Sequence, residues 1–314
     1  MTAYVVRRLF QMALALLGVS VIVFALIHVV PGDPVRIALG TRFDPDIYEA
    51  LTKRAGLDRP IVVQYFSWLG AALTGDLGVS FRSGQPVAGL LLQRLPATIT
   101  LAFASLFVAL VVSIPLGILS AIRSGSKMDY TASAASQVAV SVPDFWAGIM
   151  YILLFSLVLG WLPPSGYVSI FESPTEWLRH LVLPALTIGL ISGSIIFRFI
   201  RSAVLEALHQ PYTRTARAKG LSERAVIWRH VMPNAWIPIV TVIGLQLGFL
   251  LSGVIVVEVI FAWPGLGRLA LLSVQDRDFT VLQGAVLLIA FIFLSINLIV
   301  DVLYGYLDPR VRQK

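Results

Sequence analysis

The chain of 314 residues contains no cysteine, and only 13% of its residues are charged. The absence of cysteine excludes disulfide bonds, thiolate metal sites and cysteine nucleophiles. Soluble domains carry charged residues at about a quarter of their positions. Here 57% of the residues are hydrophobic and the mean hydropathy is +0.85. The composition therefore excludes an ordinary soluble domain and indicates a protein of the lipid bilayer.

Enzyme signatures are also missing from the sequence. It has no Gly-x4-Gly-Lys-Ser/Thr loop, so we expect no P-loop ATP site in this chain. It has no Gly-x-Ser-x-Gly elbow and no His-Glu-x-x-His pair. Its histidines lack the spacing of metal ligands; they are His28, His180, His209 and His230. We therefore predict a chain that is not an enzyme, with no metal site and no cofactor of its own.

Six apolar runs are long enough to cross about 30 Å of hydrocarbon, which takes about 20 residues each. Each run must be helical, because hydrocarbon cannot satisfy the N–H and C=O groups of an open backbone. The predicted fold is an all-α integral membrane protein. Its six transmembrane helices are expected at residues 9–30, 97–122, 131–159, 181–200, 235–257 and 281–304.

The basic residues predict the orientation of these spans. With the N-terminus inside, the inner segments hold 14 Lys and Arg residues and the two short outer loops hold three. Both termini are therefore expected in the cytoplasm, as are residues 1–8, 201–232 and 305–314, and residues 31–96 are expected outside. The net charge of +7 follows from this topology. It forms no soluble basic face with interleaved aromatics, so we expect no nucleic-acid partner.

Two further features concern the first half of the chain. The first apolar run is longer than that of a signal peptide and lacks a cleavage pattern, so we expect a retained helix. Within the polar segment 31–96, residues 47–55 and 62–73 are compatible with helices, and the second suits a bilayer surface. This segment is either an ordinary linker or a lip that receives substrate or a binding protein. The absence of an internal repeat favours a chain that supplies half of a transport pathway.

Residues 201–232 form the most basic loop of the chain. Pro211 can begin a short helix as its first residue. Gly220 can end this helix, because glycine adopts the left-handed conformation after a helix cap. Small side chains on such a helix would permit close approach by a partner; the alternative is that the basic charges only mark the inner side of the membrane. The predicted docking residues are Arg214, Thr215, Ala216, Arg217, Ala218, Lys219, Gly220, Leu221 and Pro233.

The string RTARAKG is followed by nine residues and then by HVMP. This spacing is similar to the Glu-Ala-Ala-x3-Gly-x9-Ile-x-Leu-Pro loop by which bacterial ABC importer permeases engage their ATPase subunits. Arg214 replaces the Glu and Thr215 the first Ala, as in the dipeptide and oligopeptide branch. The motifs PGDPVR, GDLGVS, VPDFWAG, VVEVIFAWPGLGR and LDPRVR also resemble the peptide/nickel family of these permeases, in family order over about 290 residues.

The resemblance implies a type I ABC importer permease in a bacterial plasma membrane, working by alternating access. The implied partners are a second homologous permease, two cytoplasmic ATPase subunits that bind ATP and Mg, and an extracytoplasmic substrate-binding protein. Short peptides are the usual cargo, and relatives carry glutathione, nickel chelates, opines or oligosaccharides. The alternatives are a stand-alone secondary transporter or channel, which would leave the basic loop without a purpose, and an intramembrane enzyme.

Polar residues inside the spans are candidates for the translocation pathway, because a charge at mid-bilayer is costly and usually faces water or the bundle interior. Asp144 would share a helical face with Ser133, Gln137, Ser141 and Gly148, beside a local kink at Pro143. Hydrogen bonding between spans is the alternative role for this face. The pathway candidates are Gln137, Ser141, Asp144, Gln246, Asn297 and Asp301.

The outer end of the fifth span carries a second candidate region. Glu258 precedes the turn that contains Trp263, and we predict an outer gate at these two residues. At the bilayer surface Glu258 could be solvated cheaply, so it would either contact substrate or hold the outer loop. In the same span Thr241, Gly244, Gly248 and Ser252 form a small-residue stripe that favours close helix packing.

Overall fold

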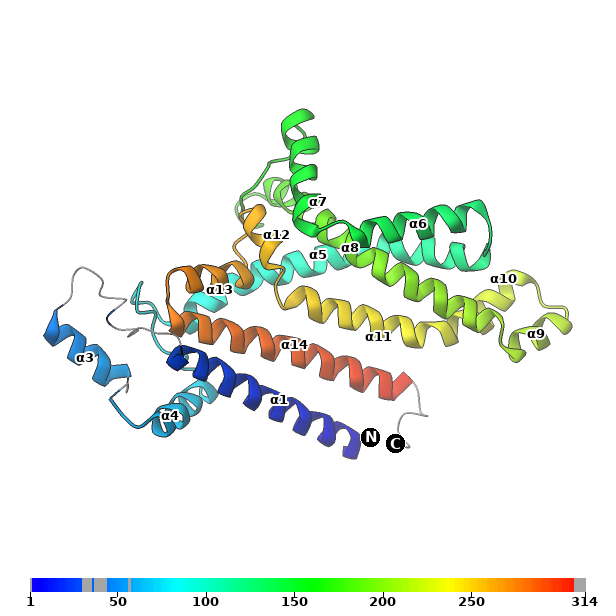
Figure 1. Ribbon diagram of the computed structural model, residues 1–314. Helices are drawn as coiled ribbons and strands as arrows, with labels where there is room; N and C mark the ends of the chain where they lie inside the picture. Colours follow the sequence, from blue (N-terminus) through cyan, green and yellow to red (C-terminus); the bar gives the residue numbers. More distant parts are fainter. Residues whose placement is uncertain (1, 30–35, 37–43, 56–57, 308–314) are drawn as a thin grey trace.

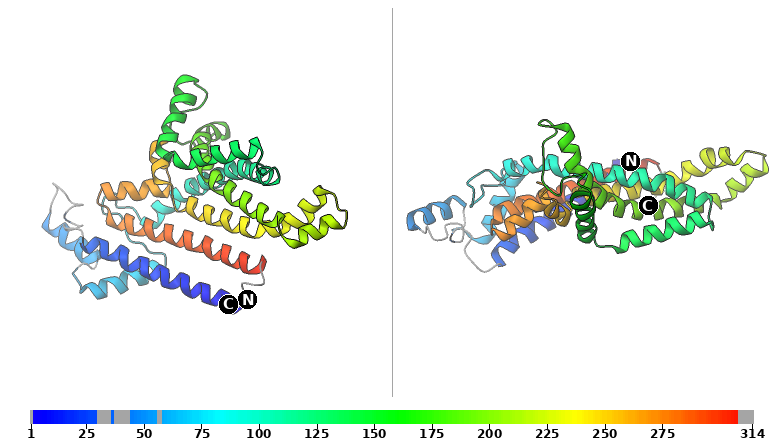
Figure 2. Two further views of the ribbon diagram at one scale, coloured as in Figure 1. Left: turned by 45° about the vertical axis from the view of Figure 1, so that its right-hand side comes forward. Right: turned by 90° about the horizontal axis from the view of Figure 1, so that it is seen from above.

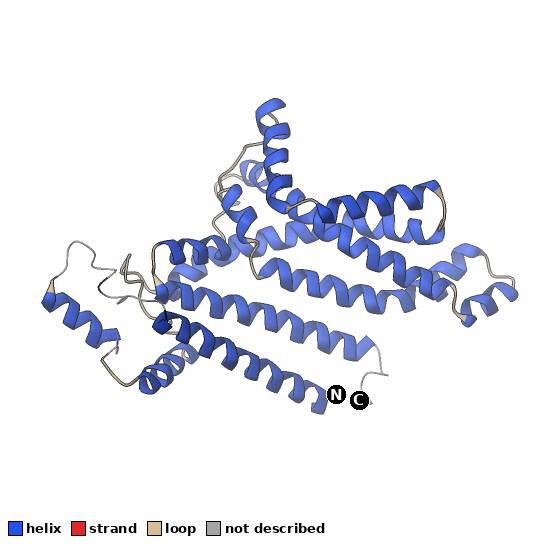
Figure 3. Ribbon diagram, viewed as in Figure 1, coloured by secondary structure: helices blue, strands red, loops and turns tan. Residues whose placement is uncertain are grey.

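Long helices that lie side by side make up most of the computed structural model, which describes residues 2–29, 36, 44–55 and 58–307 (Figures 1 and 3). Five helical segments in this described part are long and apolar enough to cross a bilayer. They are α1 (Thr2–Val29), α5 (Val87–Ile122), α8 (Pro174–Leu208), α10 to α11 (Glu223–Leu251) and α14 (Phe279–Leu307). A sixth, bent segment consists of α6 (Lys127–Ser141), α7 (Asp144–Tyr151) and the π-helix η1 (Ile152–Val158).

The core of the bundle is the contact between α5 and α8, where glycines let the two backbones approach. A Cβ atom on Gly189 would lie 2.7 Å from the carbonyl oxygen of Ser105, and one on Gly193 would lie 3.1 Å from Ala109. Neither position has room for a larger residue. Helices in lipid associate through such small-residue packing, since the surrounding hydrocarbon gives no hydrophobic drive. The α5–α8 pair is therefore the rigid centre on which the other helices pack.

Helix α1 lies at the edge of the bundle, against α14 (Figure 1). The Tyr4 hydroxyl donates to the carbonyl of Asp301 at 3.2 Å, and an Arg8 guanidinium nitrogen lies 3.2 Å from the Asp301 carboxylate. The start of α1, the end of α14 and the short helices α9 and α10 lie at one end of the bundle. This placement agrees with spans that cross the bilayer an even number of times.

The predicted span at residues 131–159 is not one continuous helix, because the chain breaks between α6 and α7. The two halves are bent by 101°. Val142 adopts an extended conformation, with φ −79° and ψ 126°, because the residue before a proline is driven out of the helical region and Pro143 has no N–H to donate. Figure 2 shows the α7 segment projecting from the bundle. The proline thus breaks the helix, where the sequence indicated only a kink.

The fifth span also ends earlier than the predicted residue 257. Helix α11 (Met232–Leu251) stops before Gly253, whose φ of +94° is incompatible with a continuing helix. The chain then forms two short helices, α12 (Ile255–Ile260) and α13 (Leu266–Gln275), before α14 begins. Helices α5 and α8 extend beyond the predicted spans, since α5 begins at Val87 and α8 runs from Pro174 to Leu208.

Within the segment 31–96, the two predicted helices are confirmed as α3 (Pro45–Ala55) and α4 (Ile61–Leu73). The segment ends in a tight turn with an isolated bridge between Val79 and Pro86. The Ser80 hydroxyl donates to the Asp278 carboxylate at 2.5 Å, and Arg82 pairs with Asp276. These contacts fix the turn to the connection between α13 and α14. The end of the segment is therefore an integral part of the bundle.

Candidate functional site

The predicted docking helix is present as α9 (Pro211–Ala218), with Pro211 at its first position. Lys219 is the C-cap and Gly220 follows it with φ +78°. The Gly220 N–H donates to the Arg217 carbonyl at 2.9 Å, and the Leu221 N–H donates to the Ala216 carbonyl at 3.4 Å. This pair of bonds is a Schellman motif, which satisfies the last carbonyls of a helix and requires a left-handed residue after the cap. The helix end is therefore set by Gly220, as the sequence predicts.

The two sides of α9 have different environments. Ala216 is buried and packs in the core of this chain, and the buried Thr213 hydroxyl donates to the Ala207 carbonyl at 2.9 Å. The idea that Ala216 offers close approach to a partner is therefore wrong. The other predicted docking residues are exposed: Arg214, Thr215, Arg217, Ala218, Lys219, Gly220, Leu221 and, at the start of α11, Pro233.

The exposed cations of α9 are not equivalent. The Arg217 Nε donates to Glu223 Oε1 at 2.7 Å and its Nη2 donates to Oε2 at 3.2 Å. This bidentate pair joins α9 to the start of α10 (Glu223–Val226). Among the described residues, Arg214 and Lys219 make no ion pair. Arg217 therefore stabilises the turn at Gly220, while Arg214 and Lys219 are available to a partner.

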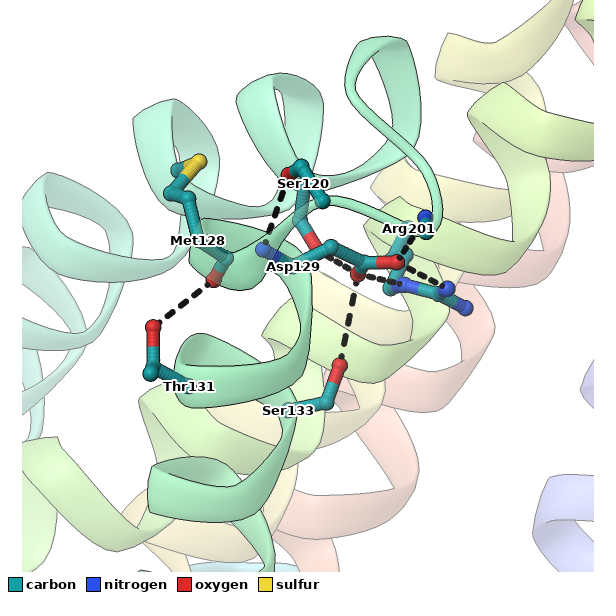
Figure 4. A network of polar contacts seen from close by, with 8 residues as sticks. Ser120, Met128, Asp129, Thr131, Ser133 and Arg201 are labelled. Atoms are coloured by element: carbon teal, nitrogen blue, oxygen red, sulfur yellow. Dashed lines mark hydrogen bonds and ion pairs between the residues drawn. The ribbon is translucent and has the colours of Figure 1, made fainter.

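A partly buried ion pair, which the sequence did not predict, stabilises the same end of the bundle (Figure 4). Asp129, in the first turn of α6, is 2% exposed. It accepts from Arg201 Nε at 2.6 Å and Nη2 at 2.8 Å, and from the Gly125 N–H at 2.9 Å. The Ser120 hydroxyl also donates to it. The signal in the sequence was Arg201 in an apolar helix, since a charge there needs a partner.

The predicted pathway face is divided by the break before α7. Gln137 and Ser141 are exposed on α6, where Arg198 Nη1 donates to Gln137 Oε1 at 3.5 Å and Ser141 donates to the Gln137 carbonyl at 2.8 Å. Asp144 lies at the start of α7, and its Oδ1 accepts from the Phe145 N–H at 2.8 Å. Gln137 and Asp144 therefore belong to differently oriented helices, and the expectation of one continuous face is wrong.

The remaining pathway candidates lie on α11 and α14. Gln246 Nε2 and Asn297 Oδ1 are buried and have no hydrogen-bond partner among the described residues. Asp301 has a structural partner, since it pairs with Arg8 of α1. The two glycines of the small-residue stripe of α11 pack against α14 of the same chain. A Cβ on Gly244 would overlap Val300, and one on Gly248 would touch Phe293 and Ile296.

Glu258 and Trp263 form a buried turn at the opposite end from α9. Glu258, in the connection outside the spans, is 1% exposed, so the expectation that water solvates it is wrong. Its Oε2 accepts from the Arg268 N–H at 2.7 Å, and burial raises its pKa to about 7. Trp263 is fully buried and its Nε1 donates to the Ala97 carbonyl at 2.9 Å. The geometry favours the structural role that the sequence left open.

These features define a multi-pass membrane protein, with apolar helices long enough to span a bilayer and a capped basic helix at one end. Residues 113–313 match the family model of the binding-protein-dependent transport system inner membrane component, and residues 1–102 match its N-terminal companion. The chain belongs to this family, the membrane-spanning subunits of ABC importers.

Relatives and solved structures agree with this assignment. The chain is 40% identical over 338 residues to the dipeptide transport system permease protein DppB of Escherichia coli K12, with 100% of both chains covered. It is 39% identical over 332 residues to DppB of Alkalihalophilus pseudofirmus, covering 99% of this chain and 100% of that one. Two inward-facing structures of the MetNI methionine ABC transporter cover 70% of this chain and 96% of theirs, at 21% and 19% identity with TM-scores of 0.56 and 0.58. At this identity the structural likeness shows the fold alone.

Proposed function

We propose that this chain is the transmembrane permease subunit of a peptide importer and that α9 is the element through which it is driven. Two full-length relatives are named dipeptide transport permeases, which supports di- or oligopeptides as cargo. The observation that carries the role of α9 is its cap at Gly220, which presents Arg214 and Lys219 to solvent in a fixed geometry. A loop that only marked membrane orientation would not need an ordered helix end.

The proposed partners follow from this arrangement. Two cytoplasmic ATPase subunits that bind ATP and Mg would supply the energy, one docked on α9 of this chain and one on a second, homologous permease. An extracytoplasmic binding protein would deliver the peptide to the end that carries α13 and the turn at residues 79–86. In this scheme ATP binding moves α9 and opens the pathway outward, and hydrolysis returns it.

The pathway is proposed to pass the break between α6 and α7. Asp144 at the start of α7 and Gln137 and Ser141 at the end of α6 would line it, since an ionised carboxylate is stable in a water-filled passage and penalised in lipid. Replacement of Asp144 by Asn keeps the shape and removes the charge. We expect transport to fall while assembly and basal ATP hydrolysis persist. Unchanged uptake of all cargo tested would reduce Asp144 to a structural residue.

The role of α9 is tested by Gly220→Val in the assembled transporter. No neighbouring atom lies within 4 Å of the place that a Cβ on Gly220 would take, so the variant strains the backbone without a clash. The matched control is Gly75→Val, which has φ +89° and equally open surroundings at the end of α4. We expect the first variant to lose ATPase copurification and peptide uptake and the second to keep both. Wild-type uptake by Gly220→Val would refute the proposal.

The orientation is tested by two introduced cysteines, which is simple because the native chain has none. Ser83, in the turn next to α5, and Ser222, the N-cap of α10, are both exposed. An impermeant thiol reagent added to whole cells should label Ser83→Cys and leave Ser222→Cys unlabelled. The reverse pattern would place α9 outside and remove it from any cytoplasmic ATPase. Uptake assays with peptides, glutathione, nickel chelates, opines and oligosaccharides then separate the cargo alternatives.

A further inference from the structure

Helix α4 has no charged residue on any of its faces, although it belongs to the polar segment between the first two spans. It is apolar, but its 13 residues are too few to cross a bilayer. A helix that is apolar all round is stable inside a protein core or in lipid. The described part of the chain buries none of its residues. Most of the α4 surface must therefore be covered by something outside this chain.

One side of α4 packs on the end of α1 that is remote from α9 (Figure 1). The hydroxyl groups of Tyr65 and Ser20 form a hydrogen bond of 2.8 Å, and the Tyr65 ring lies 5.3 Å from that of Phe24, centroid to centroid. Gln64 Oε1 lies 3.1 Å from His28 Nε2. Since Ser20, Phe24 and His28 are four residues apart in the sequence, they form one stripe along α1. This stripe fixes α4 against α1.

The contact with Ser20 shows how deep α4 lies. Helix α1 has 28 residues and is about 42 Å long, which exceeds the hydrocarbon core by about 12 Å. Ser20 lies about 13 Å from the end of α1 at Val29. Even if all of the excess length lay at this end, Ser20 would be within the hydrocarbon. The side of α4 that carries Tyr65 is therefore at the boundary between headgroups and acyl chains.

A second face of α4 presents large apolar side chains. Val62, Phe66 and Leu73 share this face, and all three are exposed, Leu73 at 81%. On α1, Leu17 lies one turn deeper than Ser20 and is also exposed. Because this part of α1 is inside the hydrocarbon, the surface beside α4 is in contact with lipid. The exposed face of α4 continues that surface.

The backbone at the C-terminal end of α4 is also suited to lipid, which cannot satisfy free carbonyl groups. The Ala71 carbonyl accepts from the Asp76 N–H at 3.0 Å and from the Thr74 hydroxyl at 2.8 Å. The Ala72 carbonyl accepts from the Gly75 N–H at 3.1 Å. These two carbonyls therefore need no water as a partner.

We propose that α4 is embedded in the leaflet at the end of the bundle opposite α9, and that phospholipid acyl chains cover the face formed by Val62, Phe66 and Leu73. The exposed charged residues on either side of the helix, Arg59 and Asp76, lie among the headgroups. The embedded helix holds this end of α1, which otherwise packs against α14. This inference needs only that the chain spans a membrane, and it does not depend on the cargo or on α9.

The test uses the assembled transporter in phosphatidylcholine nanodiscs, with a nitroxide spin label on one introduced cysteine at a time, since the native chain has no cysteine. Collisions of the label with oxygen, which concentrates in lipid, are compared with collisions with a water-soluble nickel chelate. Labels at Phe66→Cys and Leu73→Cys should collide more often with oxygen than with nickel. The lipid control is the exposed Val21→Cys of α1, next to Ser20, which should behave in the same way. The water control is Ser83→Cys in the exposed turn, where nickel collisions should dominate.

Two outcomes would overturn the proposal. Frequent nickel collisions at Phe66→Cys and Leu73→Cys, as at Ser83→Cys, would place this face in water, where a binding protein could reach it. Few collisions with either reagent would show that protein covers the face, as a second permease would. Copurification of the ATPase subunits shows that each labelled chain is assembled. If Phe66→Cys does not assemble, Val62→Cys on the same face replaces it.

Discussion

Glycine is required for different physical reasons at the two ends of the molecule. At the α9 end, Gly220 has a positive φ and open surroundings, and the side chains around it are exposed and cationic. At the other end, Gly265 has an ordinary φ of −89°, but any Cβ would overlap the buried carboxyl group of Glu258. The first glycine is required by backbone conformation and the second by space. The difference indicates that Gly220 sets the backbone of an exposed cationic surface, whereas Gly265 leaves space for a buried turn.

The largest effect should come from Gly265→Ala, which forces a methyl group into the Glu258 carboxyl. Because the neighbouring Trp263 is fully buried, the turn cannot yield outward. We expect the variant not to accumulate as folded protein in the membrane. The matched control is Gly89→Ala in α5, where no atom lies within 4 Å of the new carbon. A Gly265→Ala chain as abundant and as heat-stable as the control would contradict the contrast between the ends.

A smaller loss is expected from Asp129→Asn at the α9 end. Removing the charge leaves Arg201 without its bidentate partner. Because the Arg201 side chain is 30% exposed, we expect a loss of about 1 to 2 kcal/mol, less than for a fully buried ion pair. The control is Ser133→Ala, whose hydroxyl lies at the limit of hydrogen bonding, 3.5 Å from Asp129. Thermal denaturation of the purified proteins measures both. Equal melting temperatures for the two variants would show that the ion pair contributes little.

At the end that carries Gly265, stability should depend on pH through Glu258. Burial raises its folded-state pKa to about 7 from an ordinary 4.5, so the folded chain keeps a proton that the unfolded chain releases. This stabilisation is complete below pH 4.5 and is lost as pH rises through 7. Between pH 5 and 8 we expect the wild type to lose on the order of 2 kcal/mol. In thermal melts, the stability of Glu258→Gln should not show this fall between pH 5 and 8. If the stability of both proteins changed with pH in the same way, Glu258 would not be the cause.

The smallest effects on stability should fall on the exposed cations of α9, which nonetheless matter for transport. Arg214→Glu should leave the melting temperature unchanged and reduce ATPase copurification, because Arg214 is free to meet a partner. Arg217→Glu should weaken the turn at Gly220 only slightly, because an exposed ion pair contributes little to stability. The swap Arg217→Glu/Glu223→Arg should restore it. A swap that restored stability but lost coupling would give Arg217 a direct docking role.

The sequence predicted features that depend on nearby residues. The ends of α9 follow from Pro211 and Gly220, whose backbone preferences act within one turn, and α3 and α4 follow from local composition. The sequence predicted a kink at Pro143 where the structure has a break. Whether a helix bends or ends at a proline depends on the neighbouring helices, which the sequence does not show. Asp129 and Arg201 are 72 residues apart and meet only in the folded bundle. The burial of Glu258 likewise depends on three glycines that fold back around it.

The length of α8 has a mechanical consequence. Its 35 residues form a rod about 52 Å long, which exceeds the hydrocarbon thickness by about 20 Å. Only His209 and Gln210 separate this rod from α9, so α9 is mounted nearly rigidly on its tip. A tilt of about 5° would displace that tip by roughly 4.5 Å. Since Gly189 and Gly193 let α8 pack directly against the α5 backbone, we expect a displacement of α9 to move α8 and α5 together.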